Sequence, residues 1–425
     1  MSGKRKAALG FIFVTLLIDV MGFGVIIPIL PQLIGGMVHG GNGTSALYGG
    51  LLMFAFAGMQ FLFSPVIGNL SDQYGRRPVL LFSLMGFCID YLILALAPTI
   101  GWLFVGRILA GITGASFTTA SAYIADISTP EKRAQNFGMI GVAFGVGFIL
   151  GPLIGGYVGY FFGTRAPFYF SAGLTFLNMV YGYFILPESL DKEHRRKFDW
   201  KRANPAGALK SLKRYPALSG FMICLFCLFV AGHATQSTWI YFTAERFHWG
   251  PNMIGLSLGL VGLLVAIVQG GLVRVINPWL GVKKSIVYGL LIYMLGNILF
   301  AFANREWMMF VFMIPYCLGG FANPAMQAAT ANQVPANEQG ELQGAITSLQ
   351  SLSSIAGPLL MTNLFYFFTN KTPGSVYFPG VPFLAASVLI VAGLFFVRKG
   401  FTKLGASNPE FAAEQTVTEE IVAAE

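Results

Sequence analysis

Three charged residues lie inside long apolar stretches of this sequence, where an unpaired charge is unfavourable. Asp19 and Asp90 each fall near the middle of such a stretch, and Arg107 falls within another. An ionised Asp at the centre of a bilayer costs about 3 kcal/mol or more. Burial disfavours the charged carboxylate, whereas a nearby Arg favours it, so a balanced carboxyl group can take up and release a proton. We therefore predict proton exchange at these three residues; the alternative is a static ion pair.

A second set of polar side chains is neutral and follows helical spacing. His233 and Gln236 would share one helix face, as would Asn323 and Gln327. Uncharged hydrogen-bonding groups among many Phe and Met residues suit an amphipathic organic ligand. The alternative is that each group bonds to a neighbouring helix. The residues predicted to bind substrate are Gln60, His233, Gln236, Tyr293, Asn323, Gln327 and Gln350.

Composition indicates that membrane-spanning helices position these residues. Hydrophobic residues make up 55% of the 425 residues and charged residues 11%, against about 25% in soluble proteins. The apolar stretches approach the ~20 residues that a helix needs to cross the hydrocarbon core, where every backbone group must be paired internally. We predict an all-α membrane protein with twelve transmembrane helices. They are expected over 8–34, 46–69, 78–98, 101–125, 134–161, 165–186, 216–243, 251–275, 283–303, 307–331, 339–368 and 377–398.

Basic residues lie mainly in loops on one predicted side of the membrane. With the N-terminus inside, the inner segments carry 22 Lys and Arg residues and the outer loops carry four. Cytoplasmic loops carry this excess in membrane proteins, so the net charge of +9 does not indicate nucleic-acid binding. We expect a multi-pass protein of a bacterial inner membrane with both termini cytoplasmic.

The sequence repeats itself at an offset of 206 residues. Gly114 falls on Gly320, and the run that begins at Gly151 falls on the run that begins at Gly357. Parallel repeats of six helices are a transporter architecture, so we predict two pseudo-symmetric six-helix bundles. The charges are not repeated, because Asp90 maps to Gly296 and Arg107 maps to Met313. The predicted division is an N-terminal bundle over 1–187, a cytoplasmic linker over 188–215, a C-terminal bundle over 216–400 and a cytoplasmic tail over 401–425.

Short motifs in the chain are similar to those of a known family. The loop from Gly68 to Pro78, the segment from Gly106 to Gly114 and the run from Gly147 to Gly156 resemble motifs of the major facilitator superfamily. The third run resembles a motif of its antiporters. Asp19, with the Gly-Phe-Gly that follows it, and the Asp90-Tyr91 pair are similar to the tetracycline-exporter family. This resemblance implies a major facilitator fold and a proton-coupled drug exporter.

Two groups of residues, most of them in these motifs, are expected to take part in conformational change. The Asp72 carboxylate is placed to cap the positive N-terminus of a neighbouring helix. In this family that neighbour is the eleventh helix, which begins here near Glu338. The alternative is a solvated loop charge that fixes topology. The predicted latch is Gly68, Asp72, Gly75, Arg76, Arg77, Asp126 and Arg133, and the predicted close-packing motif, in which small residues let helices approach, is Gly147, Gly151, Pro152, Gly155 and Gly156.

The sequence departs from the tetracycline-exporter pattern at two positions. Members of that family carry a His in helix 8 and an Asp in helix 9, where this sequence has Val265 and Tyr293. Val forms no hydrogen bond and Tyr is neutral at physiological pH, so a cation-chelated ligand finds no acidic group there. We therefore expect neutral or weakly cationic aromatic compounds to be better substrates than tetracycline.

Together these features predict a proton-coupled antiporter that exports small amphipathic compounds by alternating access. We expect the proton gradient to drive it, with no metal or other cofactor. Its expected partners are a small-molecule substrate, protons and the lipid bilayer, without nucleic acid, and we expect a monomer. The alternative is a symporter or uniporter for a sugar or another metabolite. A membrane enzyme is disfavoured because the sequence shows no metal-ligand cluster, Ser-His-Asp candidate or phosphate-binding loop.

Overall fold

The protein is helical throughout the residues that the computed structural model describes. These residues are 3–38, 40–114, 116–128, 130–198, 218–331, 333–334, 339–370 and 376–407, and no strand occurs among them. Ten helical segments in this part are long and apolar enough to cross a membrane. One of them, Pro251–Phe302, has 52 residues and divides at Gly281, and the 20-residue helix Ala166–Ile185 lies outside the ten. Dividing the first and adding the second gives the twelve predicted crossings, and the all-α membrane fold is confirmed.

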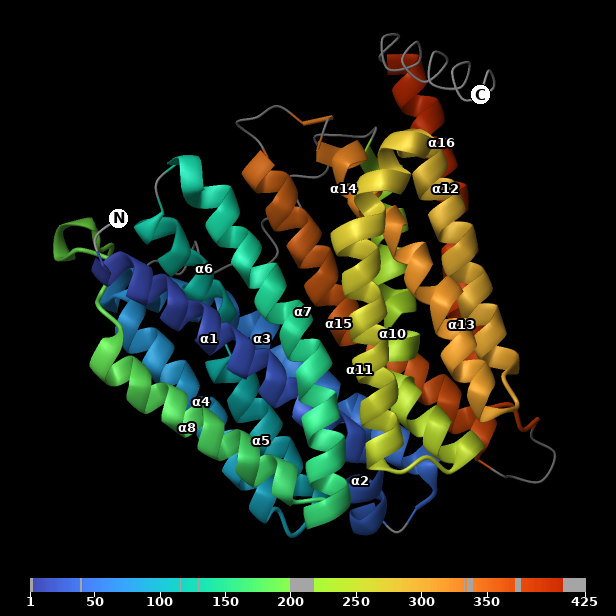
Figure 1. Cartoon of the computed structure of the whole chain (residues 1–425), viewed down its shortest axis with the longest axis horizontal. Helices are drawn as coiled ribbons and strands as arrows, with labels where there is room; N and C mark the ends of the chain where they lie inside the picture. The colour runs from blue at the N-terminus through green and yellow to red at the C-terminus, as the bar shows by residue number, and fades with distance from the viewer. Residues whose placement is uncertain are drawn as a thin grey trace. The chain divides into compact units, whose positions relative to one another are not determined.

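The first of two compact units contains residues 1–205 and 243–262. Within it α1 packs along α7, and α4 lies beside α8 (Figure 1). Its elements are α1 (Gly3–Ile26), η1 (Ile27–Ile29), α2 (Leu30–Val38), α3 (Asn42–Tyr74), α4 (Arg76–Leu96), α5 (Ile100–Thr113), α6 (Ser116–Ile127), α7 (Pro130–Phe162), α8 (Ala166–Ile185), η2 (Lys192–His194) and the first part of α11 (Pro251–Ile267).

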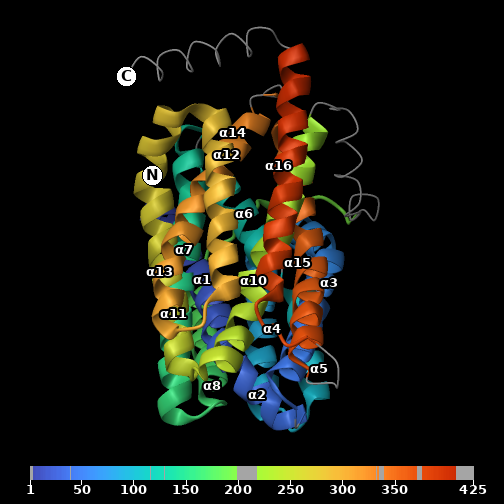
Figure 2. The ribbon, with the colours of Figure 1, turned by 90° about the vertical axis from the view of Figure 1, so that its right-hand side faces the viewer.

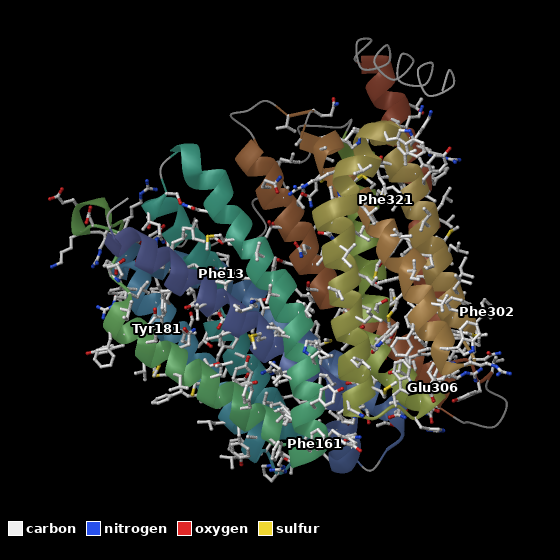
Figure 3. All side chains as sticks on the ribbon, in the orientation of Figure 1. Phe13, Phe161, Tyr181, Phe302, Glu306 and Phe321 are labelled. Atoms are coloured by element: carbon white, nitrogen blue, oxygen red, sulfur yellow. The ribbon has the colours of Figure 1, made fainter. Side chains whose placement is uncertain are left out.

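The second unit contains residues 206–242 and 263–425. Within it α12 packs against both α13 and α16 (Figure 2). Phe302 and Glu306 lie near the turn that joins α12 to α13, at one end of this unit (Figure 3). Its elements are most of α10 (Ser219–Phe247), η5 (Val268–Leu272), α12 (Val273–Phe302), α13 (Glu306–Leu318), η6 (Gly319–Phe321), α14 (Ala322–Ala331), α15 (Gln339–Thr369) and α16 (Val381–Ser407).

Backbone irregularities recur at the predicted offset of 206 residues. Gly75 has a φ of 106° between α3 and α4, and Gly281 has a φ of 71° at the kink inside α12. Glycine adopts this left-handed region without the steric cost of a side chain. The helix predicted over 101–125 breaks near Gly114, and the one predicted over 307–331 is interrupted by η6. The two halves therefore share their turns and helix breaks, which supports an internal duplication.

Some helix bounds differ from those predicted. The helix expected over 8–34 is interrupted by η1, because Pro28 and Pro31 have no N–H to donate. α3 extends beyond 46–69 in both directions, since helical hydrogen bonding continues past the apolar segment into polar residues. α16 continues to Ser407, into the stretch predicted as a tail over 401–425.

The predicted division of the chain falls partly outside the described residues. Most of the linker expected over 188–215, and the tail from residue 408, lie there. The bundle boundaries at 187 and 216 stay predictions.

Candidate functional site

A buried ion pair joins α4 and α5 in the first unit. Asp90, from the middle of α4, is fully buried, and Arg107 comes from α5. Arg107 Nη2 donates a hydrogen bond to Asp90 Oδ2. Asp90 Oδ1 and Arg107 Nε are also buried, and neither has a hydrogen-bond partner among the described residues. The pair is incompletely satisfied, and the second carboxylate oxygen of Asp90 retains the capacity to hold a proton.

The two helices approach closely at this pair. A Cβ atom at Gly106 would lie 2.7 Å from Asp90 Oδ1, so a larger residue there would displace the carboxylate. On the other side, Arg107 Cζ lies 5.7 Å from the centroid of the Phe56 ring, within cation–π range. Arg107 is thus held between a carboxylate and an aromatic face.

Tyr91 connects this pair to the helix that carries Asp19. A Cβ atom at Gly22 of α1 would lie 2.5 Å from the Tyr91 hydroxyl oxygen, so the hydroxyl reaches the α1 backbone. Asp19 is three residues before Gly22 and therefore lies on the same face of α1. The structure thus places Asp19 on α1 and Asp90 on α4, and Tyr91 reaches from α4 to the face of α1 that carries Asp19.

Gln60 contacts the break between α5 and α6. Its Nε2 donates a hydrogen bond of 2.9 Å to the carbonyl oxygen of Gly114. A helix end leaves carbonyl groups without intrahelical partners, so this contact satisfies one of them. Gln60, predicted to bind substrate, is placed here in contact with the backbone.

The predicted latch residues gather around Arg76 at the turn between α3 and α4. Arg76 Nη1 lies 2.6 Å from Asp72 Oδ1, and Arg76 Nε lies 3.2 Å from Asp126 Oδ2. Asp126 also accepts a 3.0 Å hydrogen bond from the Ser189 hydroxyl. The structure thereby joins three predicted latch residues from two separate segments. A Cβ atom added at Gly68 would meet no other part of the described chain within 4 Å, and the side chain of Arg133 lies outside the described residues.

Glu188 completes this cluster, although sequence reasoning assigned it only to the linker. Its Oε1 accepts the backbone N–H of Arg76 at 2.8 Å, and its Oε2 accepts that of Arg77 at 3.3 Å. A carboxylate at a helix N-terminus satisfies free N–H groups and the helix dipole. The first turn of α4 carries no acidic residue, and this was the sequence signal that a cap must come from elsewhere.

The glycines of the predicted packing motif face two helices. A Cβ atom at Gly147 would lie 2.8 Å from the Val20 side chain, and one at Gly151 would lie 2.8 Å from the carbonyl oxygen of Met21, both on α1. Gly155 continues this face against α1 at Val25, and Pro152 lies within α7 beside Gly24 of α1. Gly156 faces the first turn of α11, at Pro251 and Gly255. Backbone contact between these helices requires small residues.

In the second unit, tyrosines occupy the region that corresponds to the ion pair. The Tyr293 hydroxyl of α12 lies 3.5 Å from that of Tyr316 on α13. A Cβ atom at Gly296, the counterpart of Asp90, would lie 2.6 Å from Tyr316 Cα. Met313, the counterpart of Arg107, is fully buried. No room for a carboxylate exists at Gly296 in this arrangement.

The other predicted substrate residues are distributed over α10, α14 and α15. A Cβ atom at Gly232 would lie 3.9 Å from Gln236 Nε2 and 4.0 Å from the Tyr293 hydroxyl, which places these two groups around one point. His233 is buried against Gly357. The remaining three lie on α14 and α15, with Asn323 partly buried and Gln327 and Gln350 exposed.

Charged and polar groups held within apolar spanning helices, in a chain built from two similar halves, define a helical membrane transporter. Among the residues that the structure describes, no three His, Cys, Asp or Glu side chains are placed to hold a metal ion. The chain belongs to the Major Facilitator Superfamily, whose family model matches residues 12–280 and 275–421.

Tetracycline resistance proteins that are similar to the chain over most of its length support this assignment. The chain is 41% identical over 362 residues to the tetracycline resistance protein, class C, of Escherichia coli, covering 85% of this chain and 90% of that protein. It is 33% identical to the class B protein of Escherichia coli, covering 92% and 95%. These relatives and the family are transporters, so the chain is a transporter and not an enzyme.

Solved structures of transporters share the fold. A bacterial homologue of the human lysosomal transporter Spinster, in an inward-facing and occupied conformation, aligns with a TM-score of 0.74 at 16% identity over 95% of this chain and 97% of that one. The human organic anion transporter MFSD10 aligns with a TM-score of 0.68 at 24% identity over 92% and 99%. At these identities the likeness concerns the fold alone.

Proposed function

We propose that this transporter is a proton-coupled antiporter that exports small amphipathic organic compounds from a bacterial cytoplasm. The relatives that are named tetracycline resistance proteins support export of a drug-like compound. The buried Asp90–Arg107 pair is the observation that carries the proton-coupling part of the proposal. The charge asymmetry of the loops supports an inner-membrane protein with both termini in the cytoplasm.

Proton exchange would act through the pairing of Asp90. Arg107 favours the ionised carboxylate, whereas burial favours the neutral acid, so a change in the exposure of the site shifts the balance. A proton bound at Oδ1 would remove the negative charge that holds Arg107. Asp19, on α1, would exchange the same proton or a second one. Weakening this pair would loosen the contact between α4 and α5 during alternating access.

The preferred substrate is proposed to be a neutral or weakly cationic aromatic compound. Tyr293 and Gln236 lie around one point of the second unit and offer hydroxyl and amide groups without charge. Val265 and Tyr293 offer no acidic group to a cation-chelated ligand. Aromatic faces attract a cation by roughly 0.5–2 kcal/mol.

An imposed pH gradient across proteoliposomes tests the coupling. Asp90→Asn should abolish gradient-driven accumulation of substrate while leaving exchange of labelled for unlabelled substrate, because the carboxyl group is lost while the packing of α4 is kept. Asp191→Asn, at an exposed position after α8, is the control and should transport as the unchanged protein does. Full gradient-driven transport by Asp90→Asn would remove that residue from coupling. Accumulation in the direction of proton flow would instead identify a symporter.

The proposed latch concerns the resting conformation. Asp72 is already paired with Arg76 within the first unit, so its carboxylate is held at the turn from which the latch would act. Arg76, Asp126 and Glu188 fix the geometry of this turn. We infer that the cluster orients Asp72 for a contact that forms in one conformation only.

A further inference from the structure

An apolar groove runs along the outside of the first unit between α4 and α8. Its volume is about 540 Å³. Phe82 and Phe184 are exposed in it, with 48% and 79% of their surfaces accessible, so the groove faces the membrane and is not filled by the protein. The lining residues are Pro78, Leu81, Phe82, Met85, Met179, Val180, Tyr183 and Phe184.

The groove lies at the end of the helices that the loop charges predict to be cytoplasmic. Pro78 belongs to the first turn of α4, and Phe184 belongs to the last turn of α8. The two helices lie side by side (Figure 1). The groove therefore extends from the predicted inner membrane surface into the hydrocarbon layer. A linear hydrocarbon chain that enters from this surface would contact it along its length.

Arg77 lies at the surface end of the groove, and its side chain is held there. Its Nη2 donates a 2.6 Å hydrogen bond to the carbonyl oxygen of Tyr183, and its Cζ lies 5.6 Å from the centroid of the Tyr183 ring. Its backbone N–H is held by Glu188. Tyr183 itself lines the groove, so the guanidinium group is positioned directly at the groove's end.

Arg76 and Arg77 differ in how their charges are balanced. Arg76 contacts Asp72 and Asp126, so two carboxylates neutralise it. Within the described part of the chain, no salt bridge joins the Arg77 guanidinium to a carboxylate, and its Nε is buried without a hydrogen-bond partner. A cation beside an apolar groove at the membrane surface complements a molecule with an anionic head and an apolar tail.

We propose that this groove binds an anionic phospholipid, with one acyl chain in the groove and the phosphate group on Arg77. Arg presents planar N–H groups that match phosphate oxygens. The turn at Gly75 and the hydrogen bonds to Glu188 hold the backbone of Arg77 in place, so the site is formed before the lipid binds. Lipid occupancy would hold α4 against α8 near the turn that carries Asp72.

Lipid retention by the purified full-length protein tests this site without requiring transport. The protein is titrated in detergent with phosphatidylglycerol or with phosphatidylcholine of the same acyl chains, and bound lipid is counted by native mass spectrometry. We expect tighter retention of phosphatidylglycerol. Arg77→Gln should reduce that preference by about fivefold, because one basic residue at an anionic surface contributes about that factor. The control is Arg398→Gln, an exposed cation of α16 that does not line the groove, which should keep the preference.

A groove-filling variant separates the site from general surface charge. Val180→Trp should remove the tight lipid while retaining Arg77, whereas Leu177→Trp, on an exposed face of α8 that does not line the groove, should not. Glycerol phosphate, which lacks the acyl chains, should not compete. Retention unchanged in both Arg77→Gln and Val180→Trp, equal losses in the two controls, or competition by glycerol phosphate alone would each overturn the proposal.

Discussion

The two halves of the chain share a backbone plan but differ where the first carries a buried charge. In the first unit α4 and α5 approach around Asp90 and Arg107, and in the second α12 and α13 approach around two tyrosines. Gly106 permits one approach and Gly296 the other. Close helix packing is therefore common to both halves, whereas charge is specific to one. Under the proposed function, proton exchange and ligand recognition fall to different halves.

The largest effect is expected when Arg107 of the first half is replaced by methionine, the residue at the corresponding position of the second half. Arg107→Met leaves Asp90 buried without its partner and should lower the free energy of unfolding by about 3–5 kcal/mol. Asp90→Asn combined with Arg107→Met should recover most of this loss, because no charge remains buried. Denaturation in mixed micelles measures both. If the double variant stays as unstable as Arg107→Met, the pair contributes more to packing than to charge balance.

A smaller effect is expected when a methyl group is added at Gly106 or Gly296, where two helices approach closely. Gly106→Ala and Gly296→Ala each place a Cβ within 3 Å of an existing atom, so each should lose about 1–3 kcal/mol of stability. Gly58→Ala, at a helical position with no neighbour within 4 Å, is the matched control and should be neutral or stabilising by less than about 1 kcal/mol. Equal effects at all three positions would show that the approaches are not tight. Thermal unfolding in detergent measures the series.

The next largest loss of stability is expected at the two corresponding turns, at Gly75 and Gly281. Alanine at Gly75 or Gly281 must adopt a positive φ, which should destabilise each variant by about 1–2 kcal/mol. Gly75→Ala should be the worse of the two, since its Cβ would also overlap the Glu188 carboxylate. Asparagine should be no milder than alanine at either position, because ψ is 160° at Gly75 and 166° at Gly281, a region that essentially only glycine adopts. A thermal shift ranking with Gly281→Ala as the more damaged variant contradicts the role of Glu188.

The smallest effect is expected at the tyrosine pair. Tyr293→Phe removes a hydroxyl contact of 3.5 Å and should change stability by less than about 1 kcal/mol. Export rates of tetracycline, a lipophilic cation and a neutral phenol at equal concentration then test the second half as the recognition side. We expect the cation and the phenol to be exported faster than tetracycline, and Tyr293→Phe to weaken the phenol most. A preference for tetracycline that Tyr293→Phe retains would assign recognition to the first half.

The number and kind of helices could be predicted because each apolar stretch must pair its own backbone in lipid. The helix breaks were harder, since no proline marks an interruption near Gly114, and the side chain that hydrogen-bonds the Gly114 carbonyl oxygen, Gln60, comes from another helix. Pro28 and Pro31 did carry a local signal, and the break at η1 follows from it.

The site was predictable residue by residue but not contact by contact. A charge inside an apolar helix marks Asp90 and Arg107 on its own, because burial is costly whatever the neighbour is. Their pairing depends on how α4 and α5 face each other, and the spacing of residues within one helix does not predict this. Glu188 was missed because its carboxylate caps α4, a helix that lies far from Glu188 in the sequence.

The left-handed turns at Gly75 and Gly281 have a consequence for the history of the gene. A conformation that only glycine adopts cheaply changes more slowly than a side chain whose charge has lost its use. Under an internal duplication, the simplest history keeps both turns from the single ancestral copy and changes the charges after that copy was doubled. Distant members of this lineage should be recognisable by a glycine at this turn in each half, even where the acidic and basic residues have been exchanged for others.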